Sequence, residues 1–289
     1  MKDIARSPTQ TANYAFCPVK RALYSHLGVR PKRVMHSEIA AIGGKAWAVA
    51  MECWNNARRN GGVNNSVRDQ AINLAIEDIK IQKNLLIEQG REIPDWEQAY
   101  ASSIEPRVAH AIKKYVEKDP VSAFSILDVE LELTDWGRAR IDLGVSDESG
   151  ISVLDYKYKL RLDARYYDKE VNSYKNSWQQ YHYSWAYGEY KGTPIQKYII
   201  CLVVTEPKFS VQLHEFPIHP ETMLMWKQSA ELYWRDMMWE DEGMIKPRMA
   251  ITHEDKWGPC EYQRACFEHR FDLLNMQSSG DYVIVKPVD

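Results

Sequence analysis

Residues 137–159 read GRARIDLGVSDESGISVLDYKYK, and this stretch has the pattern of two strands joined by a tight turn. Apolar side chains occupy every second position from 139 to 145, which is the spacing of a half-buried strand. The segment 147–150, Asp-Glu-Ser-Gly, is rich in residues that favour turns. The segment 151–158 then predicts the second strand. The stretch therefore predicts an antiparallel β-hairpin.

Three charged residues of this hairpin are expected to lie together. If the turn centres on Glu148 and Ser149, Asp142 lies directly opposite Asp155. Such antiparallel partners have Cβ atoms roughly 4.5–5.5 Å apart. Lys157 follows Asp155 by two positions, so its side chain leaves the strand on the same face. A different turn type would shift this register along the strands.

The carboxylates of Asp142 and Asp155 are suited to a metal ion, because two facing carboxylates repel each other unless a positive charge lies between them. Mg²⁺ prefers oxygen ligands and often binds one or two carboxylates plus water. The ammonium of Lys157 can then orient a water molecule and help its deprotonation, or stabilise charge on a phosphate. The alternative is an exposed hairpin with an ordinary Asp–Lys ion pair, which contributes little to stability.

The remainder of the chain alternates between helical and strand patterns. The first 120 residues are mostly helical, with helices expected over 7–26, 38–60, 65–90 and 96–117. Further strands are expected over 129–133, 196–204, 209–216 and 282–285, and helices over 173–190 and 220–240. We therefore expect an α/β protein with a helical N-terminal region over 1–120 and a core over 121–289 that ends in a cysteine-containing tail.

The bulk composition excludes several classes of protein. Of 289 residues, 45% are hydrophobic and 27% are charged, and the net charge of −3 argues against a strongly basic nucleic-acid coat protein. No run of ~18 apolar residues predicts a membrane span, and the first residues, MKDIARSPTQ, lack the pattern of a signal peptide. Five cysteines, an odd number, argue against a secreted disulfide framework. We therefore expect a cytoplasmic protein that does not contact a membrane.

The hairpin resembles the RecB-like branch of the PD-(D/E)xK nuclease superfamily, whose core motif is an Asp, a hairpin-length spacer, then Asp or Glu, any residue and Lys. Asp142 and Asp155-Tyr156-Lys157 match this motif, and Gly137-Arg138 before them resembles the RecB-like branch in particular. The resemblance implies a restriction-endonuclease-like core with a central mixed sheet flanked by helices. It also implies that both Asp side chains and the backbone carbonyl of Tyr156 bind Mg²⁺ or Mn²⁺, with Lys157 as the catalytic lysine.

Further motifs extend the resemblance from about residue 7 to 270. Gln179 and Tyr183 are four residues apart on one helical face and resemble the family's Gln-x-x-x-Tyr motif, which positions DNA and the lysine. Gln180 is an alternative to Gln179. The segments 7–18 and 42–44 resemble the N-terminal signature and the start of the next helix in RecB-like and CRISPR-associated nucleases.

One departure from the family pattern concerns the metal ligands. Relatives usually carry a metal-binding His four residues after the glycine that matches Gly43, and that position here is Trp47, whose indole cannot bind a metal. Glu52 on the same helix is a candidate substitute ligand, ahead of Glu130 and His36, and the commoner alternative for Glu52 is an ordinary surface carboxylate. The Asp–Asp–Lys motif itself is unaffected by this change.

A second departure concerns an iron–sulfur cluster. Many relatives hold a 4Fe–4S cluster with one N-terminal and three C-terminal cysteines, and Cys17, Cys260 and Cys266 match three of these positions. The fourth position is Trp257, whereas four thiolates are the usual requirement. The alternatives are a cluster completed by His253 or Cys53, and a cluster-free contact between the N-terminal helix and the tail. The incomplete set favours the cluster-free contact.

The resemblance predicts a Mg²⁺- or Mn²⁺-dependent DNA nuclease, in particular an exonuclease, of recombination, repair or phage DNA processing. The resemblance implies DNA as a partner, and a helicase or recombination protein beside it. The sequence shows no glycine-rich loop of nucleotide hydrolases, so any ATP-driven unwinding is expected to come from another protein. The alternative functions are an inactive nuclease fold that binds DNA or protein, and an interaction protein in which the motif is accidental. The basic residues expected to contact DNA are Arg21, Arg30, Lys32, Arg33, Lys159 and Arg161.

Overall fold

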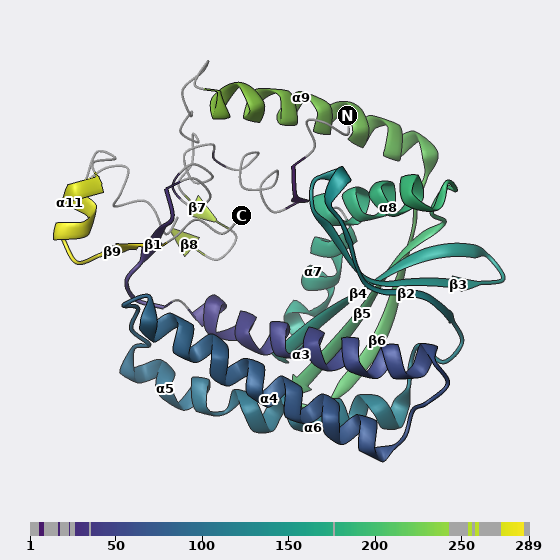
Figure 1. The fold of residues 1–289 in the computed structure, drawn as a ribbon, viewed down its shortest axis with the longest axis horizontal. Helices are drawn as coiled ribbons and strands as arrows, with labels where there is room; N and C mark the ends of the chain where they lie inside the picture. The colour runs from purple at the N-terminus through teal and green to yellow at the C-terminus, as the bar shows by residue number, and fades with distance from the viewer. Residues whose placement is uncertain are drawn as a thin grey trace.

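The computed structural model describes residues 6–8, 17, 23, 27–34, 36–175, 177–242, 254–255, 258–259 and 273–285. A five-stranded sheet lies between two layers of helices in this part of the chain (Figure 1). None of the helices within these ranges is long and apolar enough to cross a membrane. The expected helix over 7–26 and the cysteine-containing tail lie almost wholly outside them.

The central sheet contains both parallel and antiparallel strands. Its strands lie in the order β2 (Ser125–Leu133), β3 (Ala139–Asp147), β4 (Gly150–Arg161), β5 (Lys197–Glu206) and β6 (Ser210–Pro217). Neighbouring strands are antiparallel except β4 and β5, which are parallel and are joined by a helical connection. This arrangement confirms the expected α/β fold, a mixed sheet flanked by helices of the restriction-endonuclease-like kind.

Helices cover both faces of the sheet. One layer contains α3 (His36–Arg59), α4 (Asn65–Glu88) and α6 (Ile104–Lys118), and the other contains α8 (Trp178–Lys191) and α9 (Pro220–Asp241) (Figure 1). Strand β5 shows the consequence, because Ile199 and Cys201 belong to the core under α3, whereas Ile200 and Leu202 belong to the core under α8. A strand covered on both faces is a nearly continuous apolar run, as the sequence from 198 to 204 is.

Local sequence explains where the main helices lie. Helix α3 buries Ile39, Ile42 and Ala46, whose spacing of three and four residues forms one apolar stripe. Helix α8 begins after Ser177, whose side chain accepts a hydrogen bond from the first turn, and ends at Gly192, whose φ of +66° favours glycine.

The structure differs from the sequence-based expectation in two helical segments. The helix expected over 96–117 is two helices, α5 (Asp95–Ser102) and α6. Pro106 lies in the first turn of α6, and a continuous helix would place its ring against the carbonyl of Ser102, so the chain breaks at Ser103. The helix expected from residue 173 is also two, because α7 (Ala164–Lys175) precedes α8.

The last expected strand is confirmed and joins distant parts of the chain. Strand β9 (Tyr282–Ile284) pairs antiparallel with β1 (Val29–Pro31), and β7 (Glu254–Asp255) pairs with β8 (Gly258–Pro259). Helices α3, α4 and α6 share one buried cluster with strands β3, β4 and β5. The division of the chain at residue 120 stays a prediction.

Candidate active site

The β3–β4 hairpin has the register predicted from its turn. Asp147 pairs with Gly150 and Leu143 pairs with Leu154, which is the last pair of the ladder. The next position on each strand is Asp142 on β3 and Asp155 on β4. Asp142 also reaches across to β4, because its Oδ2 accepts a hydrogen bond of 2.8 Å from the backbone N–H of Tyr156. The two carboxylates therefore lie together where the ladder ends.

Asp155, Lys157 and Gln179 form a closed set of contacts. The Lys157 ammonium lies 2.5 Å from Asp155 Oδ2 and donates to Gln179 Oε1 at 2.9 Å. Gln179 Nε2 in turn donates to Asp155 Oδ1 at 3.1 Å. Asp155 is only 2% exposed, and the Lys157 side chain is 20% exposed. Gln179 thus holds the acid and the amine in place together, from the first turn of α8.

Two further residues of α8 lie close to Gln179 along the helix: Tyr183 lies one turn after it, and Gln180 follows it directly. They have different surroundings. Burial, followed by the charges of Asp155 and Asp142, raises the pKa of Tyr183 above its usual range. Its phenol therefore belongs to the same acidic neighbourhood. Gln180, the alternative to Gln179, is buried elsewhere, and in the amide orientation that satisfies its neighbours it donates to the Tyr174 carbonyl at 3.2 Å. The structure brings Gln179 to Lys157, and not Gln180.

A change of strand geometry opens the sheet beside Asp142. Val129 pairs with Leu143 and Leu131 pairs with Ile141, but the ladder skips Glu130 and Asp142 between them. Glu130 has a φ of +46°, which is rare for a residue other than glycine. Ile141 belongs to the core under α8, whereas Leu143 belongs to the core under α3, so β3 rotates at Asp142. Local distortions of this kind re-aim side chains at functional sites.

Four carboxylates interact electrostatically around this distortion. Burial, then the neighbouring charges of Asp155 and Glu130, raises the pKa of Asp142 well above its usual range. Burial also raises the pKa of Glu130 to about 7, with further contributions from Glu52 and Asp155 and an opposing one from Arg140. Arg140 Nε lies 2.9 Å from Glu130 Oε2. The surplus of negative charge favours a bound cation.

The donors present fit a hard divalent ion that keeps part of its water shell. Asp155 Oδ2 is buried, and although the Lys157 ammonium is 2.5 Å away, no donor is aligned with it for a hydrogen bond. Within the described residues, no three His, Cys, Asp or Glu side chains converge closely enough to hold an ion by themselves. Mg²⁺ needs fewer, since it often binds one or two carboxylates plus water. Asp142 and Asp155 meet that requirement, and the Tyr156 carbonyl stays a predicted third donor.

Trp47 is a core residue. Its indole is 1% exposed, stacks on Tyr158 with ring centroids 5.1 Å apart, and meets the edge of Tyr115 at 5.3 Å. These rings belong to the core under α3, whereas Lys157 contacts α8 on the other face. An imidazole in this position would enter a packed aromatic cluster rather than the acidic site.

The other suggested metal ligands lie at different distances from the hairpin. Glu52 is exposed on α3, and its charge acts on Glu130, so it lies near the acidic group. Its role as a ligand stays a prediction. His36 begins α3, where Nδ1 lies 2.9 Å from Glu97 Oε2 and the ring stacks on Tyr100. His36 therefore contributes to the contact between α3 and α5 and not to the acidic site.

The basic residues suggested for DNA binding are scattered. Arg30 is buried and donates to the Val29 carbonyl, and Lys32 pairs with Glu92 at 2.9 Å on the surface. Lys159 pairs with Glu170 at 2.6 Å. Arg33 and Arg161 are exposed, and Arg21 lies outside the described residues. Contact of any of them with DNA stays a prediction.

The cysteines suggested for an iron–sulfur site cannot be compared as a set. Cys17 is buried and free, whereas Cys260, Cys266 and Trp257 lie outside the described residues. Both the cluster and the cluster-free contact therefore stay predictions. Cys201 is a free, fully buried core residue of β5, as its apolar strand indicates.

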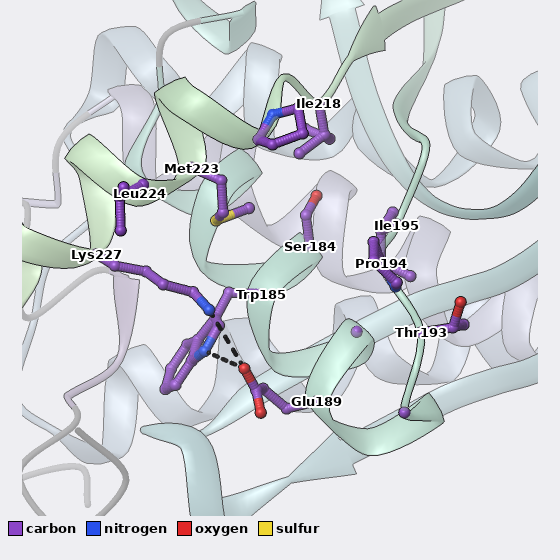
Figure 2. Close-up of a pocket in the computed structure, with 13 residues that line it drawn as sticks. Ser184, Trp185, Glu189, Thr193, Pro194, Ile195, Ile218, Met223, Leu224 and Lys227 are labelled. Carbon is purple, nitrogen blue, oxygen red and sulfur yellow. Dashed lines mark hydrogen bonds and ion pairs between the residues drawn. The ribbon is translucent and has the colours of Figure 1, made fainter.

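A cavity of about 570 Å³ lies apart from the acidic hairpin, between α8 and α9 (Figure 2). Met223, Leu224 and Ile218 line it, and Glu189 at its rim accepts from Trp185 Nε1 at 3.1 Å and pairs with Lys227 at 3.3 Å. None of the hairpin residues lines this cavity. Paired carboxylates and a lysine can bind a metal ion and transfer protons, whereas a largely apolar cavity cannot. We therefore place the candidate active site at the hairpin.

Fold and site together define a class of metal-dependent phosphodiester hydrolases, in which two carboxylates and a lysine meet where a mixed sheet opens. The sequence profile of the PD-(D/E)XK nuclease superfamily matches residues 5–267. The chain belongs to this superfamily. Membership implies a metal-dependent nuclease that binds DNA, and members typically use Mg²⁺ or Mn²⁺. No curated protein matched the chain.

Proposed function

We propose that this protein is a deoxyribonuclease of the RecB-like branch, which hydrolyses phosphodiester bonds with Mg²⁺ or Mn²⁺. The observation that supports it best is the contact set of Asp155, Lys157 and Gln179 beside Asp142. A surface ion pair would not be 98% buried on its acidic side or tied to a neighbouring helix by both partners. The arrangement therefore favours a reactive site over an accidental motif.

Each residue has a distinct part in the proposed reaction. Asp142 and Asp155 would hold the ion, which supplies Lewis-acid polarisation of the phosphate and a more acidic water. The Tyr156 N–H fixes Asp142 from the facing strand. The Lys157 ammonium, held by Gln179, donates to the attacking water or to a phosphoryl oxygen as negative charge develops there.

The RecB-like resemblance supports exonuclease activity in recombination, repair or phage DNA processing, beside a helicase or recombination protein. The chain's net negative charge restricts DNA contact to local basic surface, such as exposed Arg33 and Arg161. Contacts to phosphates carry no sequence information, so cleavage that rests on them is expected to depend little on sequence.

A second function, a catalytically inactive nuclease fold that binds DNA or protein, is favoured by one observation. Trp47 occupies the usual position of a metal-binding His and is sequestered in the core. With one ligand fewer, the site would bind its ion more weakly. The two functions differ in whether DNA is cut or only bound.

The deciding experiment incubates the purified chain with linear and circular DNA, with Mn²⁺ or with EDTA. Asp155→Asn and Lys157→Met are compared with Lys114→Ala, which removes an exposed lysine that pairs with Glu117 on the surface. Metal-dependent cutting by the wild type and the control, lost in both site variants, supports the nuclease. Loss of linear DNA alone indicates an exonuclease. Cutting that survives in both site variants contradicts the proposal, and binding without cutting supports the inactive fold.

A further inference from the structure

Helix α7 lies against the proposed active site, although no motif of the sequence pointed to it. Strand β4 ends at Arg161, and Asp163 starts α7 by accepting from the backbone N–H of Arg165 at 3.1 Å. Tyr167, Val171 and Tyr174, spaced by four and three residues, pack against the core under α8. Their side of α7 therefore faces the surface of the sheet from which Lys157 projects.

Two side chains on this inner side make a buried polar unit. Glu170 is 6% exposed, and its Oε1 lies 2.6 Å from the Lys159 ammonium. The Tyr174 hydroxyl donates to the same oxygen. A buried carboxylate requires such partners, because burial disfavours its charge. Glu170 therefore fixes the ring of Tyr174 by its hydroxyl and links α7 to β4 through Lys159.

The ring of Tyr174 faces the amine of the proposed catalytic residue. Lys157 Nζ lies 5.8 Å from the ring centroid, within the range of a cation–π contact. The ammonium is thus bounded on three sides, by Asp155, by Gln179 and by this ring. The backbone of Tyr174 is also held, since its carbonyl accepts the Gln180 amide at 3.2 Å.

We propose that Tyr174 is a positioning residue for Lys157 through its ring, a role that rests on the proposed nuclease function. A divalent ion on Asp155 would compete with the ammonium for the carboxylate oxygen that it now approaches. Gln179 and the face of Tyr174 then remain to keep the flexible amine beside the phosphate.

The test compares Tyr174→Leu, which removes the ring, with Tyr174→Phe, which keeps the ring but loses the hydroxyl. Tyr190→Leu is the matched control, because Tyr190 is an exposed tyrosine whose ring faces a different lysine, Lys191, at 5.0 Å. The measurements are kcat and KM on linear DNA with Mn²⁺, Mn²⁺ affinity by calorimetry, and the thermal midpoint. A fifth readout is the rate at which acetic anhydride labels Lys157, relative to Lys114, followed by mass spectrometry.

We expect Tyr174→Leu to lower kcat by about tenfold or more, with KM, Mn²⁺ affinity and thermal midpoint near wild type. Lys157 should be labelled faster in this variant, because its ammonium loses a covering ring. Tyr174→Phe should restore most of kcat and of the protection, and Tyr190→Leu should match the wild type in every measurement.

Several outcomes would overturn the inference. An unchanged kcat in Tyr174→Leu would show that Tyr174 does not position Lys157. A kcat as low in Tyr174→Phe as in Tyr174→Leu would show the same for the ring. A kcat loss accompanied by weaker Mn²⁺ binding or a lower midpoint would make Tyr174 merely structural. If Tyr174→Leu does not fold, equal labelling of Lys157 in the Phe variant and the wild type supports the ring contact, and faster labelling contradicts it. If the wild type cuts no DNA, the proposed nuclease function is wrong. That result is obtained before any variant is compared, so it is distinguished from a failure of the role of Tyr174.

Discussion

The backbone N–H of Tyr156 donates to Asp142 Oδ2 at 2.8 Å, so a side chain of β3 takes the place of the next ladder bond to β4. The last paired residues are Leu143 and Leu154, and beyond them the two strands are joined by this carboxylate. The same contact holds Asp142 beside Asp155. A backbone donor to the first acid is therefore part of how the hairpin assembles its site.

Replacing Asp142 by Asn should separate metal binding from folding. Asn keeps an oxygen that can accept the hydrogen bond from the Tyr156 N–H. It removes the negative charge of Asp142, which burial and the neighbouring charges of Asp155 and Glu130 all disfavour. Without metal, the thermal midpoint should equal or exceed that of the wild type. With Mn²⁺ at a hundredfold excess over the wild-type Kd, the wild type should gain about 2.7 kcal/mol and the variant much less.

The matched comparison for Asp142→Asn is Asp142→Leu, which loses the acceptor as well as the charge. It should lower the midpoint, because the Tyr156 N–H loses its partner. Differential scanning calorimetry with EDTA and with Mn²⁺ measures both effects. Equal Mn²⁺ stabilisation of the wild type and Asp142→Asn would remove Asp142 from the metal site.

Trp47→His should not restore a metal ligand. The indole is fully enclosed between Tyr158 and Tyr115 in the core under α3. The smaller imidazole would leave space there and bury two ring nitrogens where the indole buries one unpaired N–H, so we expect a loss of about 3 kcal/mol in the free energy of unfolding. Trp47→Phe, the control, should lose less. Urea unfolding measures the stability, and tighter Mn²⁺ binding by Trp47→His would contradict this placement.

Gly144 has no room for a side chain. A Cβ there would lie 1.7 Å from the hydroxyl oxygen of Tyr187, a fully buried ring whose hydroxyl donates to Asp128 at 2.6 Å. A rigid ring cannot turn aside as a flexible chain end would, so Gly144→Ala should destabilise the protein by about 3 kcal/mol. In a Tyr187→Leu background the added loss should shrink, which a double-mutant cycle in urea measures. Additive losses would contradict the clash.

Sequence patterns predict those parts of the fold whose causes are local. The hairpin register follows from a tight turn flanked by alternating residues, and the structure has that register from Leu143 to Leu154. The apolar run of β5 predicts a buried strand, and the run is continuous because both faces of the strand meet helices. The sequence pattern does not predict most of helix α7, because that segment is largely polar, although Tyr167, Val171 and Tyr174 have helical spacing.

Other features of the site depend on the whole fold and leave little local signal. The φ of +46° at Glu130 arises where two strands rotate together, and no glycine or other turn-favouring residue directly beside it predicts it. Gln179 and Gln180 are adjacent in a helix, so the sequence alone could not say which of them meets Lys157. The sheet face on which each helix lies decides that question.

The last prediction concerns acid stability through His182. Burial lowers the pKa of this imidazole to about 4, and its Nε2 donates to the Trp136 carbonyl at 2.6 Å. Since an unfolded His has a pKa of about 6.5, the unfolded chain binds a proton that the native protein excludes between these values. His182 should contribute about 3 kcal/mol of stability that is fully present above pH 6.5 and is lost as the pH drops through 4, whereas the raised pKa of Glu130 acts in the opposite direction. The stability of the wild type relative to His182→Gln should therefore fall over this range, and its stability relative to exposed His219→Gln should not. Urea unfolding from pH 7.5 to 4 measures both differences, and a constant difference between the wild type and His182→Gln would show that another group controls the acid stability.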